Sequence, residues 1–124
     1  NGIKYGDVLE KVNFEYCARL TAVNAINLAA LAWAPPQPVN VKIGGIVAPD
    51  TKLAWEKVSS KNIAGYKIYW RETTSPQWQY SKYVGDVSEF TLKGNVIDNY
   101  LFGVASVGKD GNESVVVFPS DVIR

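Results

Sequence analysis

Residues 65–72 read Gly-Tyr-Lys-Ile-Tyr-Trp-Arg-Glu, and their side chains alternate in kind from one position to the next. Tyr66, Ile68 and Trp70 share one parity, and Tyr69 has the opposite parity beside basic neighbours. A period of two is typical of a β-strand that buries one face. We therefore predict a strand here, with Tyr66 in a core and Trp70 in the core or at its rim.

Six other short segments show the same strand character and are separated by turn signals. They cover residues 39–43, 53–55, 78–83, 90–92, 100–106 and 115–118. Lys109-Asp-Gly-Asn112 is a strong hairpin signal before the last of them. Seven short strands at this spacing predict an all-β sandwich over residues 36–124. We expect Trp55 in its core and Tyr100 in a structural position.

The N-terminal part of the chain has a different period. Residues 7–33 contain neither proline nor glycine, and their apolar side chains recur every three or four positions. This spacing predicts one apolar face of a helix. Asn13 is suited to cap a main helix over Phe14–Ala34, and Asp7 a short preceding turn. Pro35-Pro36 ends the helix, so residues 1–35 form a helical segment before the sandwich.

Composition excludes several classes of function. Histidine is absent, and Cys17 is the only cysteine, so this chain alone can form neither a His–Cys zinc site nor a Ser–His or Cys–His nucleophilic pair. The net charge of +1 gives no basic footprint for nucleic acid, and no apolar run is long enough to insert into a membrane. We expect Cys17 to be a small buried hydrophobe. Because methionine is absent, we expect the chain to be part of a longer protein.

The β region resembles a fibronectin type III domain, an immunoglobulin-like sandwich. The resemblance covers residues 38–124 and is carried by the segments PVNVKI, LAWEK, GYKIYWRE, EFTLKG and YLFGVASVGKDGNES in that order. It places Tyr100 where this family has its tyrosine-corner residue. The corner segment itself departs from the family, because Asn-Val-Ile-Asp stands where an apolar residue with proline or glycine is usual.

The helical segment resembles the last helix of zinc-dependent aminopeptidases related to glutamate carboxypeptidase. The matching residues are Asp7, Glu10, Lys11, Val12, Glu15, Tyr16, Ala18 and Arg19. Family members have a zinc-ligand histidine four residues before the aspartate matched by Asp7, and this chain has Ile3 there. No metal ligand or catalytic residue is therefore carried over, and zinc is expected only in a catalytic domain outside this chain.

Together the two resemblances imply a non-catalytic accessory domain at the C-terminus of a secreted zinc metallopeptidase. They imply a spacer or a partner-binding module, in a bacterial protein that is secreted, periplasmic or in the cell envelope. The helix would contact the catalytic domain of the parent protein. In the chain alone, we expect the helix to fold back over the sandwich and cover Tyr69 and Tyr83.

Exposed aromatic side chains are the candidates for a binding surface. Tyr69 and Tyr83 are expected on one outer face, and Trp78 and Trp70 complete the set. Such a surface can stack on a sugar ring or bind a protein partner, which gives an alternative function in carbohydrate or cell-surface binding. The competing interpretation is that these rings are cross-strand pairs on a solvated face. The acidic residues near Asp110 are expected to form a hairpin turn rather than a calcium loop.

Overall fold

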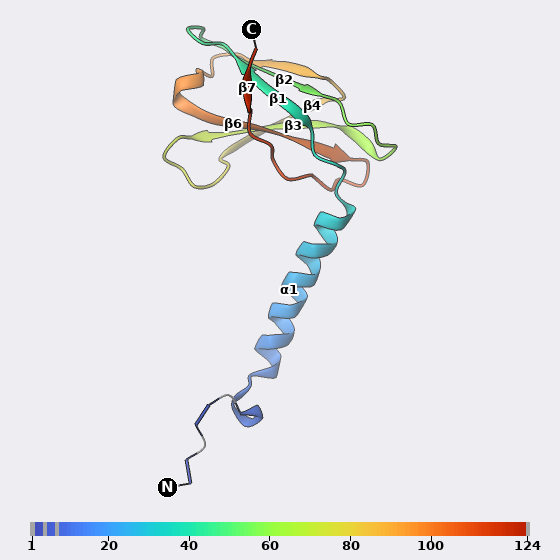
Figure 1. Cartoon of the computed structure of the whole chain (residues 1–124), viewed down its shortest axis with the longest axis vertical. Coiled ribbons are helices and arrows are strands. Elements are labelled where there is room, and N and C mark those ends of the chain that lie inside the picture. The colour runs from blue at the N-terminus through green and yellow to red at the C-terminus, as the bar shows by residue number, and fades with distance from the viewer. Residues whose placement is uncertain (1, 4, 7, 124) are drawn as a thin grey trace.

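The computed structural model describes residues 2–3, 5–6 and 8–123, and it consists of one long helix followed by two β-sheets (Figure 1). Helix α1 covers Phe14–Trp33, and 3-10 turns lie at Leu9–Lys11 and Ile97–Asn99. The strands are β1 (Val39–Gly44), β2 (Thr51–Glu56), β3 (Ile63–Glu72), β4 (Tyr80–Gly85), β5 (Glu89–Leu92), β6 (Tyr100–Gly108) and β7 (Asp121–Val122).

The strands form a four-stranded sheet in the order β5-β2-β1-β7 and a three-stranded sheet in the order β4-β3-β6. All pairings are antiparallel except β1 with β7, which is parallel. Strand β3 is the centre of the smaller sheet and pairs along most of its length with β6. The mostly β architecture in two packed sheets agrees with the predicted sandwich.

The core lies between the two sheets, as the period-two pattern predicts. Its buried apolar residues are Val41, Leu53, Trp55, Tyr66, Ile68, Leu92, Phe102 and Val104. The rings of Trp55 and Tyr66 lie 5.4 Å apart, centroid to centroid, across the two sheets. Tyr100 is half-buried and contacts Phe102 edge-on, and its hydroxyl forms no hydrogen bond within the described part of the chain. Trp55 and Tyr66 are thus core residues, whereas Tyr100 contributes through its ring.

The C-terminal part of the sandwich differs from the prediction. Instead of a strand over residues 115–118, a single bridge joins Val117 to Val104, and β7 crosses to the other sheet to pair with β1. Two features prevent a continuous ladder. The backbone N–H of Ser106 donates to the Ser114 hydroxyl rather than to a carbonyl, and Pro119 has no N–H to extend the pairing. Strand β4 likewise begins at Tyr80, two residues later than expected.

Helix α1 has the predicted start and almost the predicted end. The Asn13 side chain accepts a hydrogen bond from the Tyr16 N–H at 3.0 Å, as an N-cap should, and the last helical residue is Trp33 rather than Ala34. The predicted cap at Asp7 lies outside the described residues.

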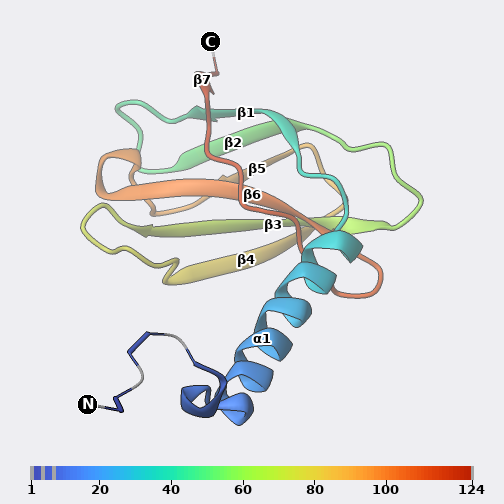
Figure 2. The same ribbon diagram turned by 60° about the horizontal axis from the view of Figure 1, so that its bottom comes forward.

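The expectation that the helix folds back over the sandwich is wrong. Helix α1 projects away from the sheets, and none of its residues is buried (Figures 1 and 2). The linker explains the direction. Pro35 and Pro38 are buried against the sandwich, and the Ser106 hydroxyl donates to the Pro36 carbonyl at 2.5 Å. The chain therefore leaves the sandwich along a fixed path.

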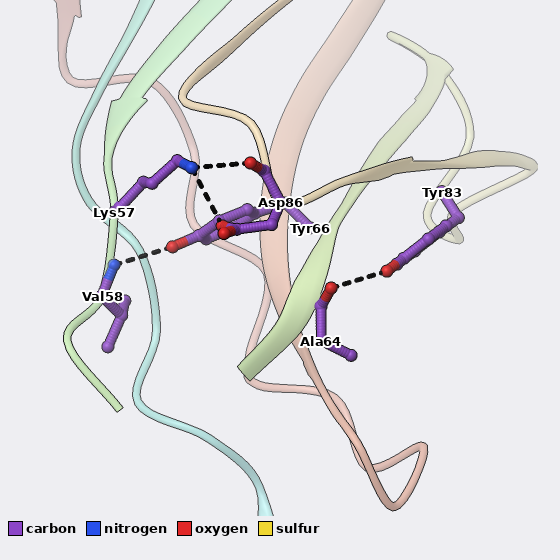
Figure 3. A network of polar contacts seen from close by, with 6 residues as sticks. All are labelled: Lys57, Val58, Ala64, Tyr66, Tyr83 and Asp86. Atoms are coloured by element: carbon purple, nitrogen blue, oxygen red, sulfur yellow. Dashed lines mark hydrogen bonds and ion pairs between the residues drawn. The ribbon is translucent and has the colours of Figure 1, made fainter. Parts of the chain in front are cut away.

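Two tyrosine hydroxyls allow a matched test of how the sandwich is held together (Figure 3). The buried Tyr66 hydroxyl accepts a hydrogen bond from the Val58 N–H at 2.7 Å, whereas the exposed Tyr83 hydroxyl donates to the Ala64 carbonyl at 2.8 Å. Tyr66→Phe should lower the free energy of unfolding by about 1–3 kcal/mol, because Val58 N–H loses its partner away from water. Tyr83→Phe should change it by less than about 0.5 kcal/mol. Urea unfolding of both variants measures the difference, and equal losses would contradict this role of Tyr66.

Candidate functional site

The two faces of β3 carry different side chains. Tyr66 and Ile68 are fully buried between the sheets, and Lys67 and Tyr69 lie on the outer face. In the register of β3 with β4, Lys67 lies opposite Tyr83. Because side chains alternate along a strand, Tyr69 and Tyr83 occupy the same outer face, as the sequence predicts.

An aromatic row runs along this outer face from β3 to the C-terminal segment. The Trp78 ring lies 5.9 Å from Tyr69 and 5.2 Å from Phe118, centroid to centroid. The guanidinium of Arg71 lies 5.6 Å from the centre of the Trp78 ring, and the Lys67 ammonium lies 5.1 Å from the Tyr69 ring centre. We call Tyr69, Trp78 and Phe118 the outer aromatic row. Sequence reasoning missed Phe118, because it assigned this residue to a regular strand.

Glu113 fixes one end of the outer aromatic row. Its carboxylate accepts a hydrogen bond from Lys67 Nζ at 2.9 Å and another from the Tyr69 hydroxyl. The hydrogen bond to Glu113 is the main cause that raises the pKa of Lys67 above its ordinary value of 10.5. Burial is the main cause that raises the pKa of Tyr69 above 10.0. Tyr69 is therefore engaged with the protein through both its ring and its hydroxyl.

Residues 109–112, just before Glu113, form the predicted hairpin turn. Asp110 accepts hydrogen bonds from the Asn112 N–H at 3.2 Å and the Asn62 side-chain amide at 3.3 Å. The bonds from Asn112 are the main cause that lowers the pKa of Asp110. Both carboxylate oxygens of Asp110 thus accept hydrogen bonds that stabilise the turn. Gly111 adopts a φ of 84°, in the left-handed region that favours glycine. Within the described residues, no three metal-ligating side chains gather in a geometry suited to a metal ion.

The other two candidate residues are not members of the outer aromatic row. Tyr83 is 52% exposed and is joined to Ala64 by its hydroxyl (Figure 3). Trp70 lies on the opposite face of β3, where its ring stacks on Tyr80 at 5.6 Å. The structure thus distributes the four predicted residues over two faces, and ligand binding by them stays a prediction.

Helix α1 carries more exposed large apolar side chains than any other helix or strand of the described chain. Its exposed large side chains are Phe14, Tyr16, Leu20, Val23, Ile26, Leu28, Leu31 and Trp33. At about 100° per residue, Tyr16, Leu20, Val23, Ile26 and Trp33 form the face predicted from their spacing, within an arc of about 140°. Phe14 and Leu28 lie on the opposite side of the helix, so the exposed apolar side chains are not confined to that face. Cys17, expected to be buried, is exposed, because no residue of α1 is buried against another described part of the chain. No helix in the described part of the chain has the length and apolarity needed to cross a membrane.

The chain is similar in sequence to parts of longer known proteins. The chain is 42% identical over 120 residues to a probable zinc metalloprotease of Leptosphaeria maculans, covering 96% of this chain and 28% of the relative. It is 38% identical over 123 residues to a probable zinc metalloprotease of Pyricularia oryzae, covering 96% of this chain and 24% of the relative. The chain therefore spans about a quarter of the length of these curated relatives. No family model matches it.

The fold has a counterpart among solved structures. A structure described as a myokine structure superposes with a TM-score of 0.54 at 17% identity, over 68% of this chain and 90% of that chain. At this identity the likeness shows the fold alone.

The relatives correct one expectation. They come from fungi, among them Leptosphaeria maculans, Pyrenophora tritici-repentis and Pyricularia oryzae. The expectation of a bacterial periplasmic or cell-envelope protein is therefore wrong.

The contact of Glu113 with Lys67 and Tyr69 predicts a loss of stability in alkali. Both raised pKa values mean that the folded chain holds its protons more tightly than the unfolded chain. The contribution of these groups to the free energy of unfolding should therefore be constant below about pH 10 and be lost as the pH rises through their folded-state pKa values. Glu113→Gln should lower stability by about 1 kcal/mol at neutral pH and flatten the alkaline decline.

The matched control is Glu89→Gln, which removes an exposed ion pair with Lys52 at 2.9 Å. It should change stability by less than about 0.5 kcal/mol and leave the alkaline decline as it is. Urea unfolding between pH 7 and 11 measures both variants. If stability falls with pH as steeply in Glu113→Gln as in the unchanged chain, Glu113 does not raise the pKa values of Lys67 and Tyr69.

Proposed function

We propose that this chain is a non-catalytic accessory segment of a zinc metallopeptidase of the aminopeptidase type. Residues 1–35 would belong to its peptidase domain and residues 36–124 would form a fibronectin type III domain. The names of the relatives support a peptidase parent, and the motif order and two-sheet fold support the domain type. The absence of histidine from the sequence supports the proposal that the zinc ligands of the parent protein lie outside this chain.

The observation that carries this proposal is the exposed apolar surface of α1. No charged residue stands between Arg19 and Lys42, and the helix bears large apolar side chains in several directions. A helix that is apolar on all sides is normally buried in a larger core, whereas a helix lying on a flat surface needs one apolar face only. The relatives contain both the helix and about three times as much additional chain, which provides a core of sufficient size.

The linker defines what the sandwich contributes in this arrangement. Because Pro35 and Pro38 are anchored, the sandwich would be held beside the peptidase domain in a limited range of orientations. It would serve as a spacer or as a surface that binds a partner, and α1 would be its attachment.

Removal of the helix tests the proposal. A chain of residues 35–124 should unfold within about 0.5 kcal/mol of the full chain, because no residue of α1 is buried against the sandwich. The full chain should self-associate and bind a hydrophobic dye, and the shortened chain should do neither. Leu20→Lys with Leu31→Lys in the full chain is the matched control and should abolish association without changing the unfolding midpoint.

Sedimentation and urea unfolding measure these effects. A shortened chain that loses more than about 1 kcal/mol would show that the helix belongs to the sandwich. A monomeric full chain that binds no dye would show that the helix surface needs no cover.

The alternative is a carbohydrate- or cell-surface-binding module built on Tyr69, Trp78 and Tyr83. The observation in its favour is that these rings lie on one solvent-facing side of the smaller sheet beside Lys67 and Arg71. Titration of tryptophan fluorescence with a panel of oligosaccharides tests it. A glycan that binds should lose at least about tenfold in affinity with Tyr69→Ala, at 1–3 kcal/mol per stacking ring. If no glycan changes the emission, this alternative fails.

A further inference from the structure

An open groove lies between the free edges of the two sheets, on the other face of β3 from the outer aromatic row. It has a volume of about 390 Å³ and is lined by Trp70 of β3, Lys82 of β4, and Phe90 and Leu92 of β5, with Lys93 and Asn95 beyond β5. Lys82 reaches across from β4, and its ammonium lies 5.1 Å from the centre of the Phe90 ring. The groove thus has an aromatic base and basic sides.

Lys82 and Lys93, the two lysines of the groove, differ from four other lysines of the sandwich. Lys42, Lys52, Lys57 and Lys67 each form an ion pair with a carboxylate. Lys82 and Lys93 form no ion pair with the described residues, and their ammonium groups donate no hydrogen bond to them. Two carboxylates lie close to groove residues without lining the groove.

Those carboxylates are Asp50 and Glu89. Asp50 accepts a hydrogen bond from the Gly94 N–H, and Glu89 pairs with Lys52, and neither lines the groove. The lining of the groove therefore contains two lysines and no acidic residue beside its apolar surface. This combination favours a ligand that brings both carboxylates and apolar groups.

The backbone around the groove favours an extended peptide as that ligand. Strands β4 and β5 are the terminal strands of their sheets, so each has one edge without a neighbouring strand in the described structure. A free edge can pair with an extended chain, whose alternate side chains then enter adjoining pockets. Lysines on edge strands repel a second identical edge, which disfavours a second copy of this chain as the occupant.

We propose that the groove between β4 and β5 binds an extended acidic peptide segment in which glutamate or aspartate alternates with aliphatic residues. The main chain of the peptide would pair with the free edge of β5. Its apolar side chains would contact Trp70 and Phe90, and its carboxylates would pair with Lys82 and Lys93. This inference does not depend on the nature of the parent protein or on the docking of α1.

Nuclear magnetic resonance of the isotope-labelled full chain tests the proposal. The probe is the capped hexapeptide acetyl-Glu-Val-Glu-Val-Glu-Val-amide, and its control has glutamine in place of glutamate. The acidic peptide should shift the indole signal of Trp70 and the amide signals of residues 80–85 and 89–95. It should bind at least about fivefold more tightly than the glutamine peptide, as expected for two partly exposed ion pairs.

A charge reversal locates the site. Lys82→Glu with Lys93→Glu should abolish the preference for the acidic peptide and give a preference for a lysine–valine hexapeptide. The matched control, Lys61→Glu with Lys109→Glu, changes the net charge equally at exposed positions outside the groove and should keep the original preference.

Four outcomes would overturn the proposal. They are equal binding of the glutamine peptide, equal effects of the two charge reversals, shifts confined to the outer aromatic row, and concentration-dependent dimerisation through β4 or β5. An oligogalacturonate that shifts the same signals at lower concentration than the peptide would also overturn it, and would assign the groove to acidic glycans.

Discussion

The contact between Tyr66 and Trp55 is the interaction on which the rest of the sandwich depends. Tyr66 lies on the central strand of one sheet and Trp55 on a central strand of the other, and both side chains are buried. The Tyr66 hydroxyl also binds the backbone just after β2. This one side chain therefore fixes both the distance between the sheets and the register of β3. Because a shift of one residue would reverse every side chain, the same contact places Lys67 and Tyr69 on the outer face.

Much of this arrangement can be predicted from the sequence, since it depends on local alternation. The parity of Tyr66 and Tyr69 follows from β3 alone, and the helix boundaries follow from Asn13 and the prolines. The partners of the outer aromatic row could not be predicted in the same way. Glu113 and Phe118 reach it from a segment far along the chain, where a serine side chain and a proline interrupt the expected strand. Contacts that depend on an irregular segment have no periodic signal.

The helix shows a different limit of sequence reasoning. Its apolar spacing was interpreted as one face, and that interpretation led to the expectation that α1 covers the sandwich. In the structure the prolines of the linker and the bond from Ser106 to the Pro36 carbonyl set the direction of the chain, and the helix points away. The path of the chain out of the sandwich is thus set by contacts of the linker, which the apolar spacing of the helix does not report.

The position of the groove relative to α1 bears on whether both surfaces can be occupied together. Helix α1 approaches the sandwich near Asn112, at the end of the sheet where β3 begins opposite Gly108. Trp70 of the groove lies seven residues further along β3 than Ile63, which corresponds to about 23 Å at about 3.3 Å per residue. A peptide in the groove and a domain around α1 would therefore contact opposite ends of the sandwich. The lining of the groove and the base of α1 accordingly share no residue.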